Sequence, residues 1–263
     1  MTLTGEQPTV AAPAAGTALV EPRPRRILVI IPAYNEANII ASVIAGVRQT
    51  TPGIPVLVVD DGSRDETASV ARSAGAKVAV HAVNLGAGGA LQTGYRYAMR
   101  EGYDAVVQID GDGQHDPEYI DELVSGLETA DYVIGSRFLH HESYTVPLSR
   151  RFGITILRGL LRLFLRRTVS DPTSGYRALS RPVFCYLARG PFPEDFPDAD
   201  VVFMLHRAGF ALTEVPVRMR KNPFGRSQHA GFRPAYYMFK QLLSIFLTIF
   251  RRFARAPRGA RYL

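Results

Sequence analysis

Acidic side chains follow an apolar segment near the middle of the chain. Residues 108–117 read Gln-Ile-Asp-Gly-Asp-Gly-Gln-His-Asp-Pro. In an extended backbone, side chains two positions apart point to the same side, so Asp110 and Asp112 can converge on one point. Carboxylate oxygens suit Mg²⁺ or Mn²⁺, and Mg²⁺ is usually held by one or two carboxylates together with substrate phosphates. Gln114 and His115 could add a ligand atom. An acidic turn without a ligand is an equally open interpretation.

The segments that position these carboxylates alternate between apolar runs and helical patterns. We expect strands at 27–31, 56–59, 78–80 and 105–109, and helices at 37–49, 68–74 and 90–100. Such alternation indicates βαβ units and a parallel sheet that is buried on both faces. Ligands bind to sheets of this kind in the crevice beyond the carboxyl ends of the strands.

Three polar turns follow these strands and hold groups that are useful to a nucleotide. They read Pro-Ala-Tyr-Asn-Glu at 32–36, Asp-Asp-Gly-Ser-Arg-Asp-Glu-Thr at 60–67 and Asn-Leu-Gly-Ala-Gly-Gly at 84–89. Helix capping and tight turns would explain any one of them. All three should lie on the edge of the sheet that carries Asp110 and Asp112, and capping does not require so many acidic and amide groups there. Together they favour a nucleotide site.

The composition favours anionic partners. The chain has 263 residues, of which 46% are hydrophobic, and its 31 Lys and Arg against 24 Asp and Glu give a net charge of +7. Such a charge suits nucleic acid, phosphorylated substrates or an anionic membrane surface. The single cysteine, Cys185, excludes an internal disulfide and is consistent with a reducing compartment. Residues 1–24 show the pattern of neither a signal peptide nor a spanning helix, and we expect a disordered lead.

Two segments in the second half combine basic residues with a wide apolar face. Residues 150–168 place Arg158, Arg162 and Arg166 four apart, and residues 236–253 lead into a basic tail. Basic amphipathic helices lie at membrane interfaces, although packing on the sheet with a solvated arginine stripe is the alternative. No aromatic platform is interleaved among the arginines, so an anionic membrane surface, with a possible membrane-protein partner, is favoured over nucleic acid.

Seven ordered motifs carry a resemblance to a known family. They are the turns 32–36 and 58–63, the stretch Asn-Leu-Gly-x-Gly-Gly-Ala-x-Gln-Thr-Gly-Tyr at 84–95, Asp-Gly-Asp-Gly-Gln-His-Asp-Pro at 110–117, Gly-Ser-Arg at 135–137, Asp-Pro-Thr-Ser-Gly-Tyr-Arg at 171–177 and Glu-Val-Pro-Val at 214–217. The chain resembles family 2 glycosyltransferases with the GT-A fold, most closely the polyprenyl-phosphate glycosyltransferases related to dolichyl-phosphate mannose synthase.

The resemblance implies an α/β, Rossmann-like catalytic domain at 25–230. Its mostly parallel sheet would be flanked by helices, with the lead at 1–24 before it and an amphipathic, basic, membrane-associating segment at 231–263 after it. It also implies roles for single residues. Pro32, Tyr34, Glu36 and Asp61 would line the base and ribose pocket, Asp110 and Asp112 with Gln114 would bind Mg²⁺ or Mn²⁺, and Arg137 would meet a phosphate.

The acceptor half offers arginines for a phosphate and carboxylates for an alcohol. A polyprenyl monophosphate, whose second pKa is about 6, is already an anion and needs positioning, not deprotonation. An alcohol would require a general base, for which Asp171 and Asp200 are the available carboxylates. A capped turn explains Asp171 equally well. The candidate contacts to an acceptor phosphate are Arg150, Arg151, Arg177, Arg220 and Lys221.

The sequence therefore predicts an inverting transferase at the cytoplasmic face of the membrane. It would move a sugar from a UDP- or GDP-sugar to a polyprenyl phosphate with a divalent cation, and Asp112, Arg137, Asp171 and Asp200 are its candidate catalytic residues. Transfer to a soluble or polysaccharide hydroxyl is one alternative, and a non-catalytic membrane-bound adaptor is another. Ala87 stands where many relatives carry Lys or Arg, which removes one possible phosphate contact, and Asn222 stands where relatives tend to carry Arg, for which Arg220 or Lys221 could substitute.

Overall fold

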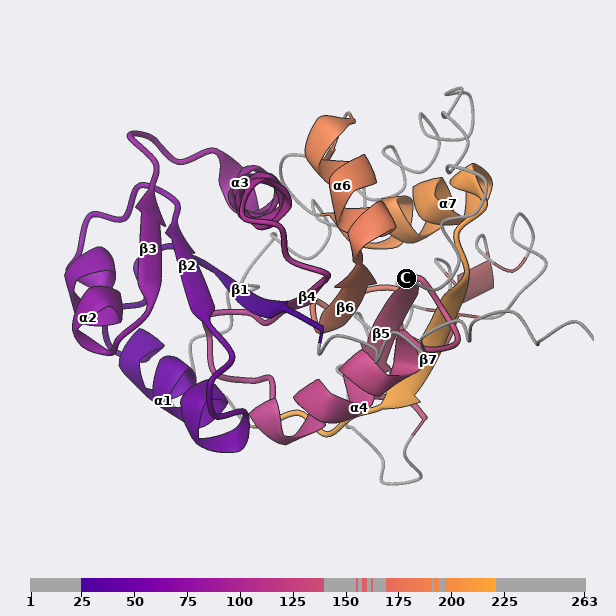
Figure 1. Ribbon diagram of the computed structural model, residues 1–263, viewed down its shortest axis with the longest axis horizontal. Helices are drawn as coiled ribbons and strands as arrows, with labels where there is room; N and C mark the ends of the chain where they lie inside the picture. The colour runs from indigo at the N-terminus through magenta and orange to yellow at the C-terminus, as the bar shows by residue number, and fades with distance from the viewer. Residues whose placement is uncertain are drawn as a thin grey trace, which may run out of the picture.

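The computed structural model of the chain describes most of the predicted catalytic domain. The described residues are 25–139, 169–190, 192–193 and 197–220, together with positions 155, 158, 159 and 162. Two predicted segments and three predicted residues fall outside them: the lead at 1–24, the C-terminal segment 231–263, and the acceptor candidates Arg150, Arg151 and Lys221. Within the described part, a twisted sheet lies between two groups of helices (Figure 1).

The sheet is parallel except for one strand. Its strands are β1 (Ile27–Ala33), β2 (Val56–Asp60), β3 (Lys77–Val80), β4 (Ala105–Gln108), β5 (Tyr132–Ser136), β6 (Arg177–Ser180) and β7 (Leu212–Pro216), in the spatial order β3-β2-β1-β4-β6-β5-β7. Only β6 runs antiparallel to both of its neighbours among these strands. The carboxyl ends of the parallel strands and the start of β6 therefore share one edge. The strand order reverses next to β1, where a crevice is expected at that edge.

The helices divide the apolar residues into two cores. Above the sheet in Figure 1 lie α3 (Gly86–Arg100), α6 (Arg181–Arg189) and α7 (Ala199–Ala208). Against the other face lie α1 (Ile40–Thr50), α2 (Thr67–Ser73) and α4 (Ile120–Gly126), with the short 3₁₀ helix η1 (Pro117–Tyr119) before α4. Successive residues of β1 serve opposite cores, since Leu28 and Ile30 pack in one cluster and Val29 and Ile31 in the other.

A glycine allows α3 to lie close to the sheet. A Cβ atom added to Gly94 would lie 2.6 Å from Cγ2 of Ile30 in β1, so a larger residue would push the helix away. Contact of this kind fixes the helix whose first turn faces the edge described above. Packing in the core thus positions the first turn of α3 at the edge of the sheet where the parallel strands end.

The α/β fold and its first four strands are confirmed, and two helix starts are corrected. The glycine-rich stretch expected as a turn at 84–89 is largely the first turn of α3, which begins at Gly86 and not at residue 90. The amides of Leu85 and Gly86 donate to the carboxylate of Asp61, which stabilises these early helical positions. Helix α1 begins at Ile40, not at residue 37.

The basic amphipathic segment is described at four positions. Thr155, Arg158, Gly159 and Arg162 are helical, in agreement with the helix predicted at 150–168, whose other positions lie outside the described residues. In the part of the chain that the structure covers, no helix is both long enough and apolar enough to cross a bilayer.

Candidate active site

The two central carboxylates lie where β4 ends beside β1. The amide of Ile109 still pairs with the carbonyl of Ile30 at 3.0 Å, and the chain then turns at Asp110. The side chain of Asp110 remains 44% exposed. A Cβ atom on Gly111 would lie 3.1 Å from the carbonyl oxygen of Pro32, so the backbone packs directly on the loop after β1. The Asp110–Asp112 pair therefore borders the loop predicted to hold the nucleotide.

The environment raises the pKa of both carboxyl groups. Desolvation by the surrounding protein, and then the charge of Asp198, raise the pKa of Asp110 to about 6, while Arg177 and Arg137 act in the opposite direction. The pKa of Asp112 is raised by desolvation and by Asp110, although its Oδ1 accepts a hydrogen bond from the amide of Gln114 at 3.0 Å. Two carboxylates that disfavour each other's charge would be stabilised by a cation.

The donor set suits a cation that arrives with a phosphate. In the described residues there is no group of three or more His, Cys, Asp or Glu side chains that could hold a metal by itself. Asp110 and Asp112 offer two carboxylates, which matches the number that Mg²⁺ commonly takes from a protein when phosphate oxygens supply the rest. Gln114 lies next to the pair, with its amide bonded to Asp112.

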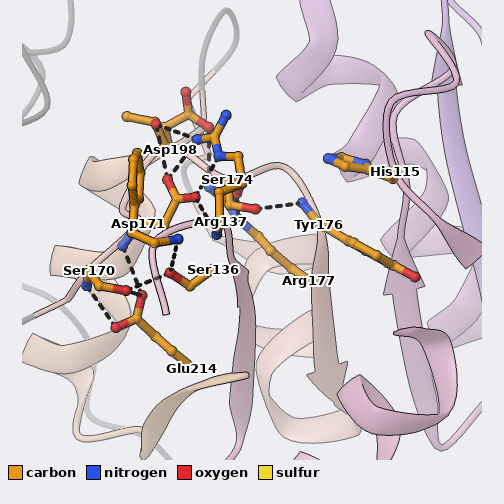
Figure 2. Close-up of polar contacts among 12 residues, drawn as sticks. His115, Ser136, Arg137, Ser170, Asp171, Ser174, Tyr176, Arg177, Asp198 and Glu214 are labelled. Carbon is orange, nitrogen blue, oxygen red and sulfur yellow. Dashed lines mark hydrogen bonds and ion pairs between the residues drawn. The ribbon is translucent and has the colours of Figure 1, made fainter. Parts of the chain in front are cut away.

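His115 supports the acidic turn and does not fit the role of an additional ligand. Its Nδ1 accepts a hydrogen bond from the amide of Asp110 at 3.0 Å, so the proton of the neutral ring is on Nε2, which lies 3.7 Å from Oδ2 of Asp110. Burial lowers the pKa of His115 to about 4, which keeps the ring neutral. The ring stacks on Tyr176 at 4.8 Å between centroids (Figure 2).

The loops after β1 and β2 are joined to each other. The amide of Asn35 donates to Oγ of Ser63 at 2.9 Å, and the amide of Arg64 donates to Oδ1 of Asn35 at 2.8 Å. The amide of Glu36 donates to Oγ1 of Thr67 at 2.9 Å. These bonds hold the loop that contains Pro32, Tyr34 and Glu36 at the edge beside Asp110. Tyr34 is 39% exposed and thus accessible to a ligand.

Asp61 occupies a different place from the one predicted. Its residue is only 3% exposed, and its carboxylate accepts hydrogen bonds from the amides of Leu85 and Gly86 and contacts Nδ1 of His81. The structure therefore places Asp61 beneath the surface of the nucleotide loops, where it holds other groups, and not on an open pocket wall. Sequence reasoning missed His81, for which only its position just after an expected strand gave a signal.

Arg137 and Asp171 form a buried ion pair. Nε and Nη2 of Arg137 each lie 2.6 Å from an oxygen of Asp171, and the Arg137 amide donates to the same carboxylate at 3.1 Å. Asp171 is 0% exposed and Arg137 is 5% exposed. An enclosed and already paired carboxylate does not favour the predicted role of Asp171 as a general base, which stays a prediction. Arg137 was expected to meet a phosphate, but its guanidinium is engaged with Asp171 and Thr173.

A glutamate on β7 holds the segment that carries Asp171. Glu214 accepts hydrogen bonds from the amides of Ser170 and Asp171 at 2.7 and 2.8 Å, and from Oγ of Ser170 at 2.9 Å. Oγ of Ser136, at the end of β5, contacts Oγ of Ser170, and Figure 2 shows these groups together below the Arg137–Asp171 pair. Sequence reasoning quoted Glu214 within a motif but gave it no role.

The segment from Asp171 to β6 crosses over the central carboxylates. A Cβ atom on Gly175 would lie 2.5 Å from Oδ2 of Asp110, so a larger residue at this crossing would displace that carboxylate. Next to it, Arg177 is 2% exposed and donates to the carbonyls of Ser174 and Pro197 and to Asp198. A buried and paired guanidinium does not favour the predicted contact of Arg177 to the acceptor phosphate, which stays a prediction.

Asp198, which sequence reasoning passed over, is more exposed than the neighbouring Asp200 and acts on the central carboxylate Asp110. Asp200 is 2% exposed, and its Oδ1 accepts from the amide of Val201 in the first turn of α7, which does not suit the predicted base. The side chain of Asp198 is 18% exposed, pairs with Arg177 at 3.1 Å and acts on the pKa of Asp110. The spacing of Asp198 and Asp200, two positions apart, was the available signal.

Arg220 lies on the far side of the acidic turn. Its amide donates to the carbonyl of Gln114 at 2.8 Å, and its Nη2 lies 2.8 Å from Oδ1 of Asp116, with the side chain 53% exposed. Arg220 thus reaches the neighbourhood of the carboxylate pair, as predicted for a phosphate contact, but it is anchored to Asp116.

Comparison with known proteins identifies the family that shares these features. A sequence model described as "Glycosyl transferase family 2" matches residues 28–187. The undecaprenyl-phosphate mannosyltransferase of Micrococcus luteus is 33% identical over 214 residues, which cover 78% of this chain and 88% of that one. The polyprenol monophosphomannose synthase of Mycolicibacterium smegmatis is 29% identical over 237 residues, covering 82% of this chain and 85% of that one.

Solved structures share the fold. Glucosyl-3-phosphoglycerate synthase from Mycobacterium tuberculosis, in complex with Mn²⁺ and UDP-glucose, superposes with a TM-score of 0.64 at 26% identity, covering 85% of this chain and 78% of that one. The same enzyme in complex with phosphoglyceric acid gives a TM-score of 0.67 at 24% identity, covering 85% and 80%. The sheet and its flanking helices are therefore those of a glycosyltransferase fold.

Proposed function

The chain belongs to glycosyl transferase family 2, and we propose that it is an inverting enzyme that moves a sugar from a nucleoside-diphosphate sugar to a polyprenyl phosphate. The observation that carries the proposal is the Asp110–Asp112 pair at the sheet edge, beside the joined loops after β1 and β2. The acceptor is supported by the relatives, two of which are named for transfer to undecaprenyl phosphate or synthesis of polyprenol monophosphomannose.

Mg²⁺ or Mn²⁺ fits the carboxylates of Asp110 and Asp112. The raised pKa values mean that the protein disfavours the ionised form of both carboxyl groups, and a bound cation would offset this cost. Gln114 lies next to the pair. When bound, the cation would supply charge stabilisation for the departing diphosphate. Pro32, Tyr34 and Glu36 would orient the nucleoside, because the bonds from Asn35 and Glu36 to the loop after β2 fix their backbone.

In the proposed reaction, an oxygen of the acceptor phosphate forms a bond to the anomeric carbon. The bond from that carbon to the diphosphate breaks, and the nucleoside diphosphate leaves with the electron pair. A phosphate monoester with a second pKa of about 6 is already ionised, so no base is needed. This agrees with the burial of Asp171 and Asp200, which would be the bases for an alcohol acceptor. A phosphate acceptor is therefore favoured over a hydroxyl acceptor.

We place the enzyme peripherally on the cytoplasmic face of the membrane, where it would meet a lipid acceptor. The net charge of +7 favours an anionic lipid surface, and the exposed, helical position of Arg162 agrees with a basic helix there, whereas Arg158 donates to the Ser170 carbonyl within the protein. A membrane-protein partner would be compatible with this location. An adaptor without turnover does not fit, because the chain belongs to a family of transferases and keeps both central carboxylates.

The test is product formation by the purified chain with UDP- and GDP-sugars, a short polyprenyl phosphate, and Mg²⁺ or Mn²⁺. We expect a lipid-linked sugar of inverted anomeric configuration, and no product with a chelator in place of the metal. Product formed with the corresponding polyprenyl alcohol, but not with the phosphate, would refute the acceptor assignment. Retention of configuration, read by NMR of the anomeric proton, would refute the inverting mechanism.

A further inference from the structure

The three turns predicted to surround a nucleotide are joined in series. The first turn bonds to the second through Asn35 and Ser63. The second turn meets the third at Gly62, where an added Cβ atom would lie 2.8 Å from the backbone carbon of Val83, and at Asp61. The amide of Asp61 also donates to the carbonyl of Ala33 at 2.8 Å. Asp61 is therefore the junction at which all three turns meet.

The carboxylate of Asp61 fastens the start of α3 to the end of β2. Its Oδ1 accepts from the amide of Leu85 at 2.9 Å, and its Oδ2 accepts from the amide of Gly86 at 2.8 Å. A negative charge at the first turn of a helix is also stabilised by the helix dipole. The position of the glycine-rich turn, relative to the loop after β1, thus depends on the orientation of the Asp61 carboxylate.

His81 sets that orientation. Its Nδ1 lies 2.7 Å from Oδ1 of Asp61, and its Nε2 lies 2.9 Å from Oγ1 of Thr93 on α3. Nδ1 donates to the Asp61 carboxylate, and Nε2 lies within hydrogen-bond distance of the Thr93 hydroxyl, which can either donate or accept. Thr93 is about two helical turns beyond Gly86. His81 therefore links β3 to Asp61 and to the body of α3 at the same time.

We propose that His81 is a positioning residue for the nucleotide part of the donor. It makes no contact with the donor itself, and it acts by holding Asp61, which in turn fixes the first turn of α3 against the loop after β1. The inference rests on the proposed nucleotide-sugar donor and adds a residue to that site. A histidine that only fills space would not direct both ring nitrogens at partners on two different elements, with the side chain 11% exposed.

Three substitutions separate the two contacts of His81. His81→Asn keeps an N–H near the place of Nδ1 and gives up Thr93, whereas His81→Gln keeps a group near the place of Nε2 and gives up the bond to Asp61. Thr93→Val removes only the hydroxyl.

Losing the partner of a buried carboxylate should weaken donor binding about tenfold. We therefore expect His81→Gln to raise the donor KM by about that factor, with kcat and acceptor KM nearly unchanged. His81→Asn should restore most of the affinity. Thr93→Val should have a smaller effect.

The experiment measures binding of UDP and of GDP with Mn²⁺ by calorimetry, then donor and acceptor KM and kcat for each variant. Thr129→Val, at an exposed position in the turn that follows α4, is the matched control for Thr93→Val. Wild type that binds neither nucleotide would refute the proposed donor and this inference with it. If wild type binds and His81→Gln binds equally well, the inference fails while the proposed function stands. If His81→Asn is no better than His81→Gln, and both lose thermal stability in proportion, His81 has a merely structural role.

Discussion

The two ends of the sheet use charge in opposite ways. We call the end formed by β1 to β4 the donor side, and the end formed by β5 to β7 the acceptor side. On the donor side, Asp110 and Asp112 lie next to each other beside a neutral His115, and their pKa values are raised. On the acceptor side, Arg137 pairs with Asp171 in a fully enclosed contact. Burying an unpaired charge is costly, so the unbalanced donor side is suited to a cation, whereas the balanced acceptor side is suited to holding the backbone in place. Residues of the same type thus have different tasks according to burial and partners.

Breaking the acceptor-side pair from one end should have the largest effect. Arg137→Met leaves the charge of Asp171 enclosed without its guanidinium partner, and we expect the free energy of unfolding to fall by about 3–5 kcal/mol. Denaturant unfolding followed by circular dichroism measures it. Combining Arg137→Met with Asp171→Leu should recover part of the loss. Arg100→Met, at a side chain that is 80% exposed, is the control. Unchanged stability of Arg137→Met would remove the contrast between the two sides.

Removing a donor-side charge should instead affect turnover. Asp112→Asn should lower the rate of sugar transfer by roughly 10²–10³-fold, as for the loss of one preorganised electrostatic group, and leave the fold intact. Release of nucleoside diphosphate in the presence of Mn²⁺ measures it. Asp121→Asn, at an exposed position of α4, controls for the general loss of a carboxylate. Loss of folding in Asp112→Asn, with turnover retained by the folded fraction, would contradict the assignment.

Gly175 tests how tightly the acceptor-side segment constrains the donor side. Gly175→Ala places a methyl group 2.5 Å from Oδ2 of Asp110, so the carboxylate must move. Displacement of a reacting group by about 1 Å costs on the order of 10²-fold in rate, which sets the upper limit of the expected loss. Gly159→Ala, where an added Cβ meets nothing within 4 Å, should behave like wild type. Equal activity of Gly175→Ala and wild type would show that the crossing does not fix Asp110.

The smallest effect should be a change in the pH dependence of stability. The folded-state pKa of Asp110 is about 6, above its ordinary value of 3.8. Its contribution to stability is thus fully present below about pH 4 and is lost as the pH rises through 6. Asp110→Asn should therefore be more stable than wild type at pH 7 without metal, and this advantage should be smaller at pH 5. Melting temperatures at both pH values, with a chelator present, measure it. A constant difference would contradict the raised pKa.

The sequence predicted the donor side well because its elements are local. Strand, turn and helix follow one another from Ile27 to Gln108, and the carboxyl ends of parallel strands necessarily share an edge. The spacing of Asp110 and Asp112 then located the carboxylate pair. The start of α3 was misplaced, because glycine is unfavourable inside a helix and its early positions depend on a carboxylate from β2, distant in sequence.

The acceptor side could not be predicted in the same way, because its charged residues pair with partners that are far away in the sequence. Nothing near Arg137 in the sequence indicates Asp171 as its partner, and nothing near Glu214 indicates the amides that it binds. The motif containing Arg177 suggested an accessible guanidinium, whereas the fold encloses it beside Asp198. Burial decides such cases, and burial depends on strand pairings that the local pattern does not encode.

The pairing of β6 with β4 also has a consequence for the order in which the chain acquires its structure. The centre of the sheet is complete only when Arg177 in β6 has paired with Gln108 in β4, whereas β1 to β4 pair among themselves. During synthesis from the N-terminus, the nucleotide half is therefore available for folding before the strand that closes the sheet has been made.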